Sequence, residues 1–230
     1  MSKDELMEKL SDAISKGDPE VSASVARDII AAGIDPLEAI LSGATRGLDI
    51  VGEKFERLEA FLPDLMRAGD AMKTCVEIFK EKMPAEDLSK AGLGKVVIGT
   101  VFGDIHDIGK NLVSTMLSAA GFEIHDMGIK VAVKEFAKKA EELGVDVIAL
   151  SALLTNTSHY QRMVIEYLRD AGIREKYYVI VGGSVVSPEF AQEIGADGYA
   201  RTAVGAAELA KKLVSGSEKP PISETVIIDH

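Results

Sequence analysis

The 230-residue sequence has one cysteine, Cys75, and no tryptophan. A single thiol allows neither an internal disulfide nor a four-cysteine zinc site, which excludes the disulfide-rich secreted class. The first residues, 1–5, are charged and lack the apolar core of a signal peptide. No apolar run approaches the roughly 18 residues that a membrane helix needs. We therefore expect a soluble, cytoplasmic protein.

Basic residues are fewer than acidic ones. The sequence has 26 Lys and Arg residues and 37 Asp and Glu residues, so the formal net charge is −11. An acidic protein repels phosphate backbones and anionic lipids, so we expect neither nucleic acid nor a membrane as a partner. The composition, 47% hydrophobic and 27% charged, is ordinary for a globular protein and excludes a disordered or collagen-like chain.

Residues 1–84 have the periodicity of helices only. Apolar residues recur at spacings of three and four, as the buried stripe of an amphipathic helix requires. Asp18-Pro19 and Asp35-Pro36 each place a capping carboxylate before a proline at the first helical position. Four helical segments are predicted, the last beginning at Phe61, and they are typical of a small antiparallel bundle. Residues 85–94 are predicted to be a linker.

After residue 95, short β-branched runs alternate with helical segments. This rhythm predicts an open parallel sheet of five strands with helices on both faces, spanning residues 95–215. Residues 216–230, which include Pro220-Pro221, are predicted to be an extended or mobile tail. The predicted strands are 95–101, 122–127, 145–151, 177–181 and 197–200.

The loop after the first predicted strand is the most informative stretch. It places His106 between Asp104 and Asp107 at the carboxyl edge of the sheet, where such folds bind ligands. A histidine that binds a metal usually donates its other ring N–H to a carboxylate, and Asp104 is suitably placed. The other reading is a loop histidine with a local hydrogen bond to an aspartate. No second histidine clusters with His106, so a zinc site is disfavoured and a metal whose other ligands belong to a macrocycle is favoured.

Two later strands end in small or hydroxyl residues. Residues 151–157 carry several hydroxyls, and residues 182–184 are Gly-Gly-Ser. Each stretch alone is typical of a helix cap or a turn. Because all three stretches lie on one rim of the predicted sheet, they predict a narrow slot for a long ligand tail.

Together these residues resemble the cobalamin-binding module of methionine synthase and the free-standing corrinoid proteins of methyltransferase systems. Both gaps agree with that family's pattern, with 41 residues between the first and second elements and 28 between the second and third. The matching elements are Asp104-x-His106-x-x-Gly109, Ser151-x-Leu153 and Gly182-Gly183.

The resemblance extends to the helical half and implies a fold. The segments 51–55 and 61–63 are similar to the helical cap of methyl-carrying members. The implied architecture is a four-helix cap domain, 1–84, followed by a Rossmann-like, flavodoxin-like cobalamin-binding domain, 95–215.

The resemblance also implies residue roles. His106 is expected to be the lower axial ligand of cobalt, Asp104 to accept a hydrogen bond from its far nitrogen, and Thr157 to complete this relay. Phe61 is expected to shield the upper face of the cofactor. The other expected cofactor-binding residues are Gly103, Ile105, Asp107, Gly109, Ser151, Leu153, Thr155, Gly182, Gly183 and Ala200.

The family implies a methyl carrier that cycles between cobalt(I) and methyl-cobalt(III). We expect a component of a methyltransferase system rather than a complete enzyme. Its partners would be a donor-specific methyltransferase, an acceptor methyltransferase and a reductive activase. The donor stays open among methanol, methylamines, glycine betaine and methoxyaromatics. The alternatives are a cobalamin-dependent sensor, a radical mutase subunit, and a signalling domain with Asp104 or Asp107 as phosphate acceptor.

Overall fold

The computed structural model describes residues 1–83 and 94–229. The chain divides into two compact units, an N-terminal one of Met1–Leu93 with Ser118–Gly121 and a C-terminal one of Gly94–Leu117 with Phe122–His230. Of the linker predicted at 85–94, all but residue 94 lies outside the described residues. No helix within the described ranges is long and apolar enough to cross a membrane.

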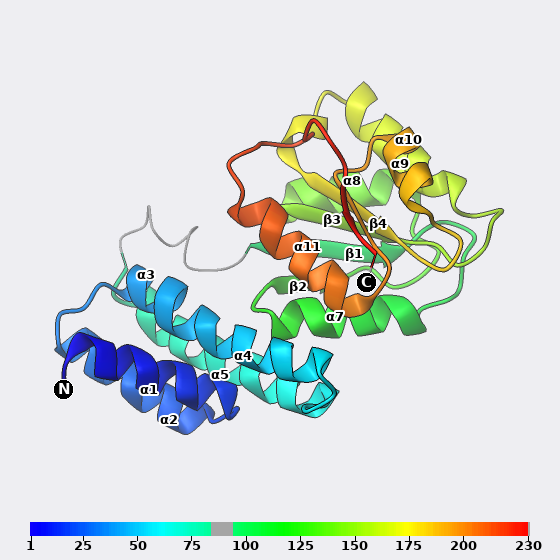
Figure 1. Cartoon of the computed structure of the whole chain (residues 1–230). Coiled ribbons are helices and arrows are strands. Elements are labelled where there is room, and N and C mark those ends of the chain that lie inside the picture. Colours follow the sequence, from blue (N-terminus) through cyan, green and yellow to red (C-terminus); the bar gives the residue numbers. More distant parts are fainter. Residues whose placement is uncertain (84–93, 230) are drawn as a thin grey trace. The chain divides into compact units, whose positions relative to one another are not determined.

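The N-terminal unit is helical, with four helical segments as predicted (Figure 1). The third of them is continuous from residue 36 to 56 and contains one π-helical stretch. Side-chain caps explain where three helices begin: Ser2, Asp18 and Asp35 each accept a hydrogen bond from a backbone N–H of the first turn. The elements are α1 (Lys3–Ser15), α2 (Pro19–Ala31), α3 (Pro36–Glu38), η1 (Ala39–Ala44), α4 (Thr45–Glu56) and α5 (Leu62–Lys80).

The C-terminal unit is a parallel sheet in the order β2-β1-β3-β4-β5-β6. The prediction of five strands is wrong, because the described residues contain a sixth, formed by the segment expected to be a tail. The strands are β1 (Lys95–Thr100), β2 (Glu123–Asp126), β3 (Val147–Ser151), β4 (Tyr178–Gly182), β5 (Gly198–Ala200) and β6 (Val226–Ile228).

Hydrogen bonds explain why the C-terminal segment joins the sheet. The Tyr178 hydroxyl donates to the carbonyl of Glu218 at 2.6 Å. The buried carboxylate of Asp197 accepts the N–H of Ile222 at 2.9 Å. These contacts hold the segment beside β5, and β6 then pairs with it in parallel. None of these partners is close in sequence, so the local pattern does not reveal the strand.

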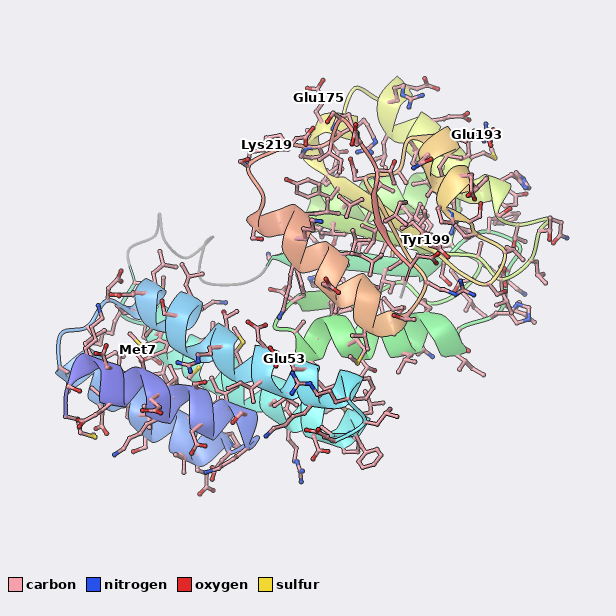
Figure 2. The ribbon with its side chains drawn as sticks, in the orientation of Figure 1. Met7, Glu53, Glu175, Glu193, Tyr199 and Lys219 are labelled. Atoms are coloured by element: carbon pink, nitrogen blue, oxygen red, sulfur yellow. The ribbon has the colours of Figure 1, made fainter. Side chains whose placement is uncertain are left out.

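Helices cover both faces of the sheet (Figure 1). On one face, Val97 and Ile148 pack in a core with Phe136 and Leu168 of the covering helices. Charged residues such as Glu193 project outward from this unit (Figure 2). The helices are α7 (Ile108–Ala119), α8 (Val133–Leu143), α9 (His159–Asp170), the 3-10 helix η2 (Arg174–Lys176), α10 (Pro188–Ile194) and α11 (Ala203–Ser215).

The opposite face of the sheet carries small residues near its carboxyl edge. One row across the strands runs through Ile98, Ala149, Ile180 and Gly198. Farther toward the edge, Ser151 pairs with Gly182. Because Ala149 and Ser151 have short side chains and the glycines have none, the sheet leaves room beneath the helices that cover this face.

Candidate functional site

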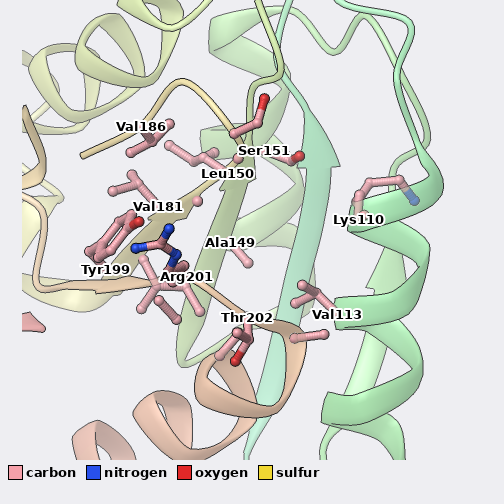
Figure 3. Close-up of a pocket in the computed structure, with 18 of the residues that line it drawn as sticks. Lys110, Val113, Ala149, Leu150, Ser151, Val181, Val186, Tyr199, Arg201 and Thr202 are labelled. Atoms are coloured by element: carbon pink, nitrogen blue, oxygen red, sulfur yellow. The ribbon is translucent and has the colours of Figure 1, made fainter. Parts of the chain in front are cut away.

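A cavity of about 780 Å³ opens at the carboxyl edge of the sheet, within the C-terminal unit. Its floor is the face of the sheet that carries Ala149, and its walls come from α7 and α11 (Figure 3). Val113 lies on one wall and Leu209 on the other. The predicted slot is therefore present at the predicted edge of the sheet.

The loop between β1 and α7 carries His106 at the cavity. Its imidazole lines the cavity and is 43% exposed. The ring Nδ1 lies 2.7 Å from Oδ1 of Asp104, and the backbone N–H of His106 donates to the same oxygen at 3.1 Å. The carboxylate therefore fixes the ring with Nδ1 protonated, which leaves the lone pair of Nε2 available to a ligand.

The second carboxylate oxygen of Asp104 binds a loop that is distant in the sequence. Oδ2 accepts the backbone N–H groups of Leu153 at 2.8 Å and Leu154 at 3.2 Å. It also lies 2.8 Å from the hydroxyl of buried Thr157, which can donate its single proton either here or to the carbonyl of Leu154. Asp104 thus joins the His106 loop to the loop that follows β3.

Asp104 is fully buried and stays ionised. Burial raises the pKa of its carboxyl, but the hydrogen bonds from His106, Leu153 and Thr157 outweigh burial and hold that pKa far below the usual value. A buried carboxylate with both oxygens occupied is a poor phosphate acceptor, so this geometry argues against the signalling alternative for Asp104.

Glycine is required where the loop after β4 comes close to the backbone of neighbouring segments. Gly183 has a φ of +125°, and a Cβ there would lie 1.8 Å from the carbonyl oxygen of Ala152. Next to it, a Cβ on Gly182 would lie 3.3 Å from the carbonyl oxygen of Ala200. The glycine pair therefore keeps the slot open between neighbouring strand ends.

Half of the predicted site residues line this cavity. Gly103, Ile105 and Asp107 lie in the His106 loop, and Thr155 is exposed in the loop after β3, but none of these four lines the cavity. Those that line it are His106, Gly109, Ser151, Leu153, Gly182, Gly183 and Ala200.

Phe61 lies in the N-terminal unit at the start of α5. Its side chain is 69% exposed, and its backbone N–H donates to the carboxylate of Asp64 at 2.8 Å. This contact caps the first turn of α5 and presents an apolar ring to the surroundings. A shielding role for Phe61 stays a prediction.

Sequence reasoning missed part of the lining. Lys110 and Val113 were within reach, because they follow Gly109 on one helix. Arg201 directly follows Ala200 and was also within reach. Asp229 carried no local signal, because only the long-range pairing of β6 brings it to the cavity.

Two family models match the chain, and both are described as a B12 binding domain. One covers residues 94–208 and the other residues 6–80. Trimethylamine corrinoid protein 1 of Methanosarcina acetivorans is 45% identical over 88% of this chain and 94% of its own length. Dimethylamine corrinoid protein 2 of the same organism is 46% identical over 94% of this chain and 99% of its own.

Solved structures agree with these relatives. The methanol:cobalamin methyltransferase complex MtaBC from Methanosarcina barkeri aligns with a TM-score of 0.73 at 29% identity, over 94% of this chain and 82% of that one. A cobalamin-binding protein from Desulfitobacterium hafniense aligns with a TM-score of 0.67 at 31% identity, over 91% of this chain and 98% of that one.

Proposed function

The chain belongs to the corrinoid proteins with B12 binding domains, and we propose that it carries methyl groups from a methylated amine. In this proposal, His106 binds the cobalt of the cofactor. It is a corrinoid methyl carrier that works with a methyltransferase. Its cofactor is a cobalamin, which when bound would supply the cobalt chemistry of methyl transfer.

The donor set at the cavity fits this cofactor. Within residues 1–83 and 94–229, no group of three or more His, Cys, Asp or Glu side chains can hold a metal ion. The site offers one imidazole, His106, beside a slot with glycines at its rim. A metal whose other ligands belong to a macrocycle would need only this one nitrogen from the protein.

The hydrogen bonds of Asp104 are the observation that carries the assignment of His106. They hold the ring through Nδ1 and leave Nε2 for cobalt. The negative charge of the carboxylate makes Nε2 a stronger ligand for a metal. If His106 released a bound metal, Asp104 would keep the imidazole in place through the same hydrogen bond. The hydroxyl of Thr157 lies 2.8 Å from the other carboxylate oxygen and can donate to it, which would hold the carboxylate in this orientation.

The slot is assigned to the nucleotide tail of the cofactor. Ser151, Gly182 and Gly183 form its rim, and Ala149 lies on its floor. Phe61 is assigned to the shield over the methyl group, where an apolar ring excludes water and must move aside for a partner.

The donor assignment rests on the methylamine relatives. Trimethylamine and dimethylamine corrinoid proteins are 45% and 46% identical to this chain. We assign the donor-specific partner to a methyltransferase for one of these amines, the second partner to an acceptor methyltransferase, and reactivation of oxidised cobalt to a reductive activase.

The assignment of His106 is tested by absorption spectroscopy after hydroxocobalamin is added and free cofactor is removed. The wild-type chain should retain the corrin band with the signature of an imidazole lower ligand. His106→Ala should lose that signature and bind more weakly. His125→Ala is the matched control, because His125 lies on β2 beside Glu123 and does not line the cavity. An unchanged spectrum in His106→Ala would overturn the ligand assignment.

The donor is tested with the reduced cobalamin-loaded protein and purified methyltransferases for trimethylamine, dimethylamine and methanol. Each is supplied with its own substrate, and methylation is followed by the change in the cobalt absorption bands. One of the amine enzymes should methylate the protein fastest. Faster methylation by the methanol enzyme would overturn the donor assignment and leave that of His106 intact.

A further inference from the structure

The described lining of the cavity contains two basic side chains, one lysine and one arginine, Lys110 and Arg201. The side chain of Lys110 is 1% exposed, and its ammonium pairs with Asp126 and donates to Asn111. Arg201 differs, because Figure 3 shows its guanidinium over the cavity beside Tyr199. Arg201 is therefore the cation that a ligand in the slot can meet.

The backbone of Arg201 is fixed while its guanidinium is only weakly held. Its N–H donates to the carbonyl of Ile228 at 3.0 Å, which ties it to β6. Within the described part of the chain, the guanidinium pairs with Asp229 alone, at 3.5 Å, and the two side chains are 68% and 47% exposed. This distance exceeds that of a good hydrogen bond, so the N–H donors can turn to a stronger acceptor.

Apart from Asp229, the cavity lining also includes hydroxyl and alkyl side chains. Ser184 and Ser187 supply hydroxyls, and Ala206 and Leu209 supply alkyl groups. The nucleotide tail of a cobalamin contains a phosphodiester with one negative charge. In a chain of net charge −11, that anion needs a local cation. A planar guanidinium matches two phosphate oxygens in geometry and charge.

We propose that Arg201 binds the phosphodiester of the cofactor's nucleotide tail and that Asp229 competes for the same guanidinium. This inference rests on the proposed function, because it takes the slot as the place of the tail. Asp229 follows β6, beyond the residues 94–208 that the B12 binding domain covers. The C-terminal strand thus supplies a carboxylate that tunes how tightly this chain holds the tail.

The test compares two corrinoids by fluorescence or absorption titration. Cobalamin carries the phosphodiester, whereas cobinamide lacks the phosphodiester, ribose and base. Arg201→Gln should weaken cobalamin binding about fivefold, the scale of one exposed charge pair, and change cobinamide binding less than twofold. Asp229→Asn should strengthen cobalamin binding roughly twofold, because the competing anion is gone.

Arg162→Gln is the matched control. It removes the same charge from α9, where Arg162 pairs with Glu193 away from the cavity, and should leave both affinities unchanged. A second readout is salt: sodium chloride should weaken cobalamin binding more steeply in the wild type than in Arg201→Gln. Circular dichroism establishes that each variant is folded.

Two results would overturn the inference. In the first, Arg201→Gln weakens the binding of both corrinoids equally, which would make Arg201 a structural residue. In the second, Arg201→Gln leaves the affinity for cobalamin and its salt dependence unchanged. In either case wild-type binding of cobalamin would keep the proposed function. Failure of the wild-type chain to bind either corrinoid would overturn the proposed function and this inference together.

Discussion

Replacement of Asp104 by asparagine should destabilise the C-terminal unit even without cofactor. The buried carboxylate accepts hydrogen bonds from His106, Leu153, Leu154 and Thr157, and so links two loops. An asparagine has only one acceptor oxygen, and its NH₂ group would lie against the donors that now bind the second carboxylate oxygen. Asp104→Asn therefore removes one of two acceptor oxygens that both have hydrogen-bond donors in the fold.

The magnitude follows from these bonds. If the asparagine oxygen takes the place of Oδ2, the backbone N–H of His106 loses its acceptor, at about 1–2 kcal/mol for a partly buried donor. The remaining bonds lose the assistance of a full negative charge, which adds about 1–2 kcal/mol. The expected loss in the free energy of unfolding at pH 7 is therefore roughly 2–4 kcal/mol.

The loss should depend on pH with a defined sign. Hydrogen bonds hold the pKa of Asp104 in the folded state below its usual value of 3.8. Its contribution to stability is therefore full above about pH 4 and declines as the pH falls further toward the folded-state pKa. Asp104→Asn lacks this contribution at every pH, so the difference from the wild type should shrink below pH 4.

Urea unfolding followed by circular dichroism at pH 7 and pH 3 measures both effects. Asp107→Asn is the control, because Asp107 is exposed in the same loop and, among the described residues, its carboxylate accepts a hydrogen bond only from Asn111. This control should change stability by less than about 0.5 kcal/mol. A difference between the wild type and Asp104→Asn that is below 1 kcal/mol, or equal at both pH values, would refute the reasoning.

Other predictions concern single residues. Gly183→Ala should cost about 2–4 kcal/mol in urea unfolding and close the slot to cobalamin, because the new Cβ meets the carbonyl of Ala152 at 1.8 Å. Gly109→Ala, with no atom within 4 Å of the new Cβ, should be tolerated; equal losses in both would contradict the steric argument. Burial raises the pKa of the Cys75 thiol to about 12, so iodoacetamide at pH 8 should label it only after unfolding. Rapid labelling of the folded protein would contradict this.

The sequence predicted most elements because their burial follows a local period. Each of the five expected strands is present, with boundaries shifted by at most two residues. The Asp104–His106 contact could also be predicted, because the two residues are only two positions apart in one loop and an aspartate side chain can span that separation. Resemblance to a family added Thr157, which the structure brings to Asp104 across a separation of 53 residues.

Only tertiary structure decided the remaining features. Nothing local marks Val226–Ile228 as a strand, because three residues carry too little periodicity and their pairing depends on Asp197 and on the edge of β5. The same pairing brings Asp229 beside Arg201. The sequence alone therefore predicted the edge of the sheet at which the cavity lies and singled out His106 as the candidate metal ligand. The shape and charge of the slot came from contacts between residues far apart in the chain, which periodicity does not encode.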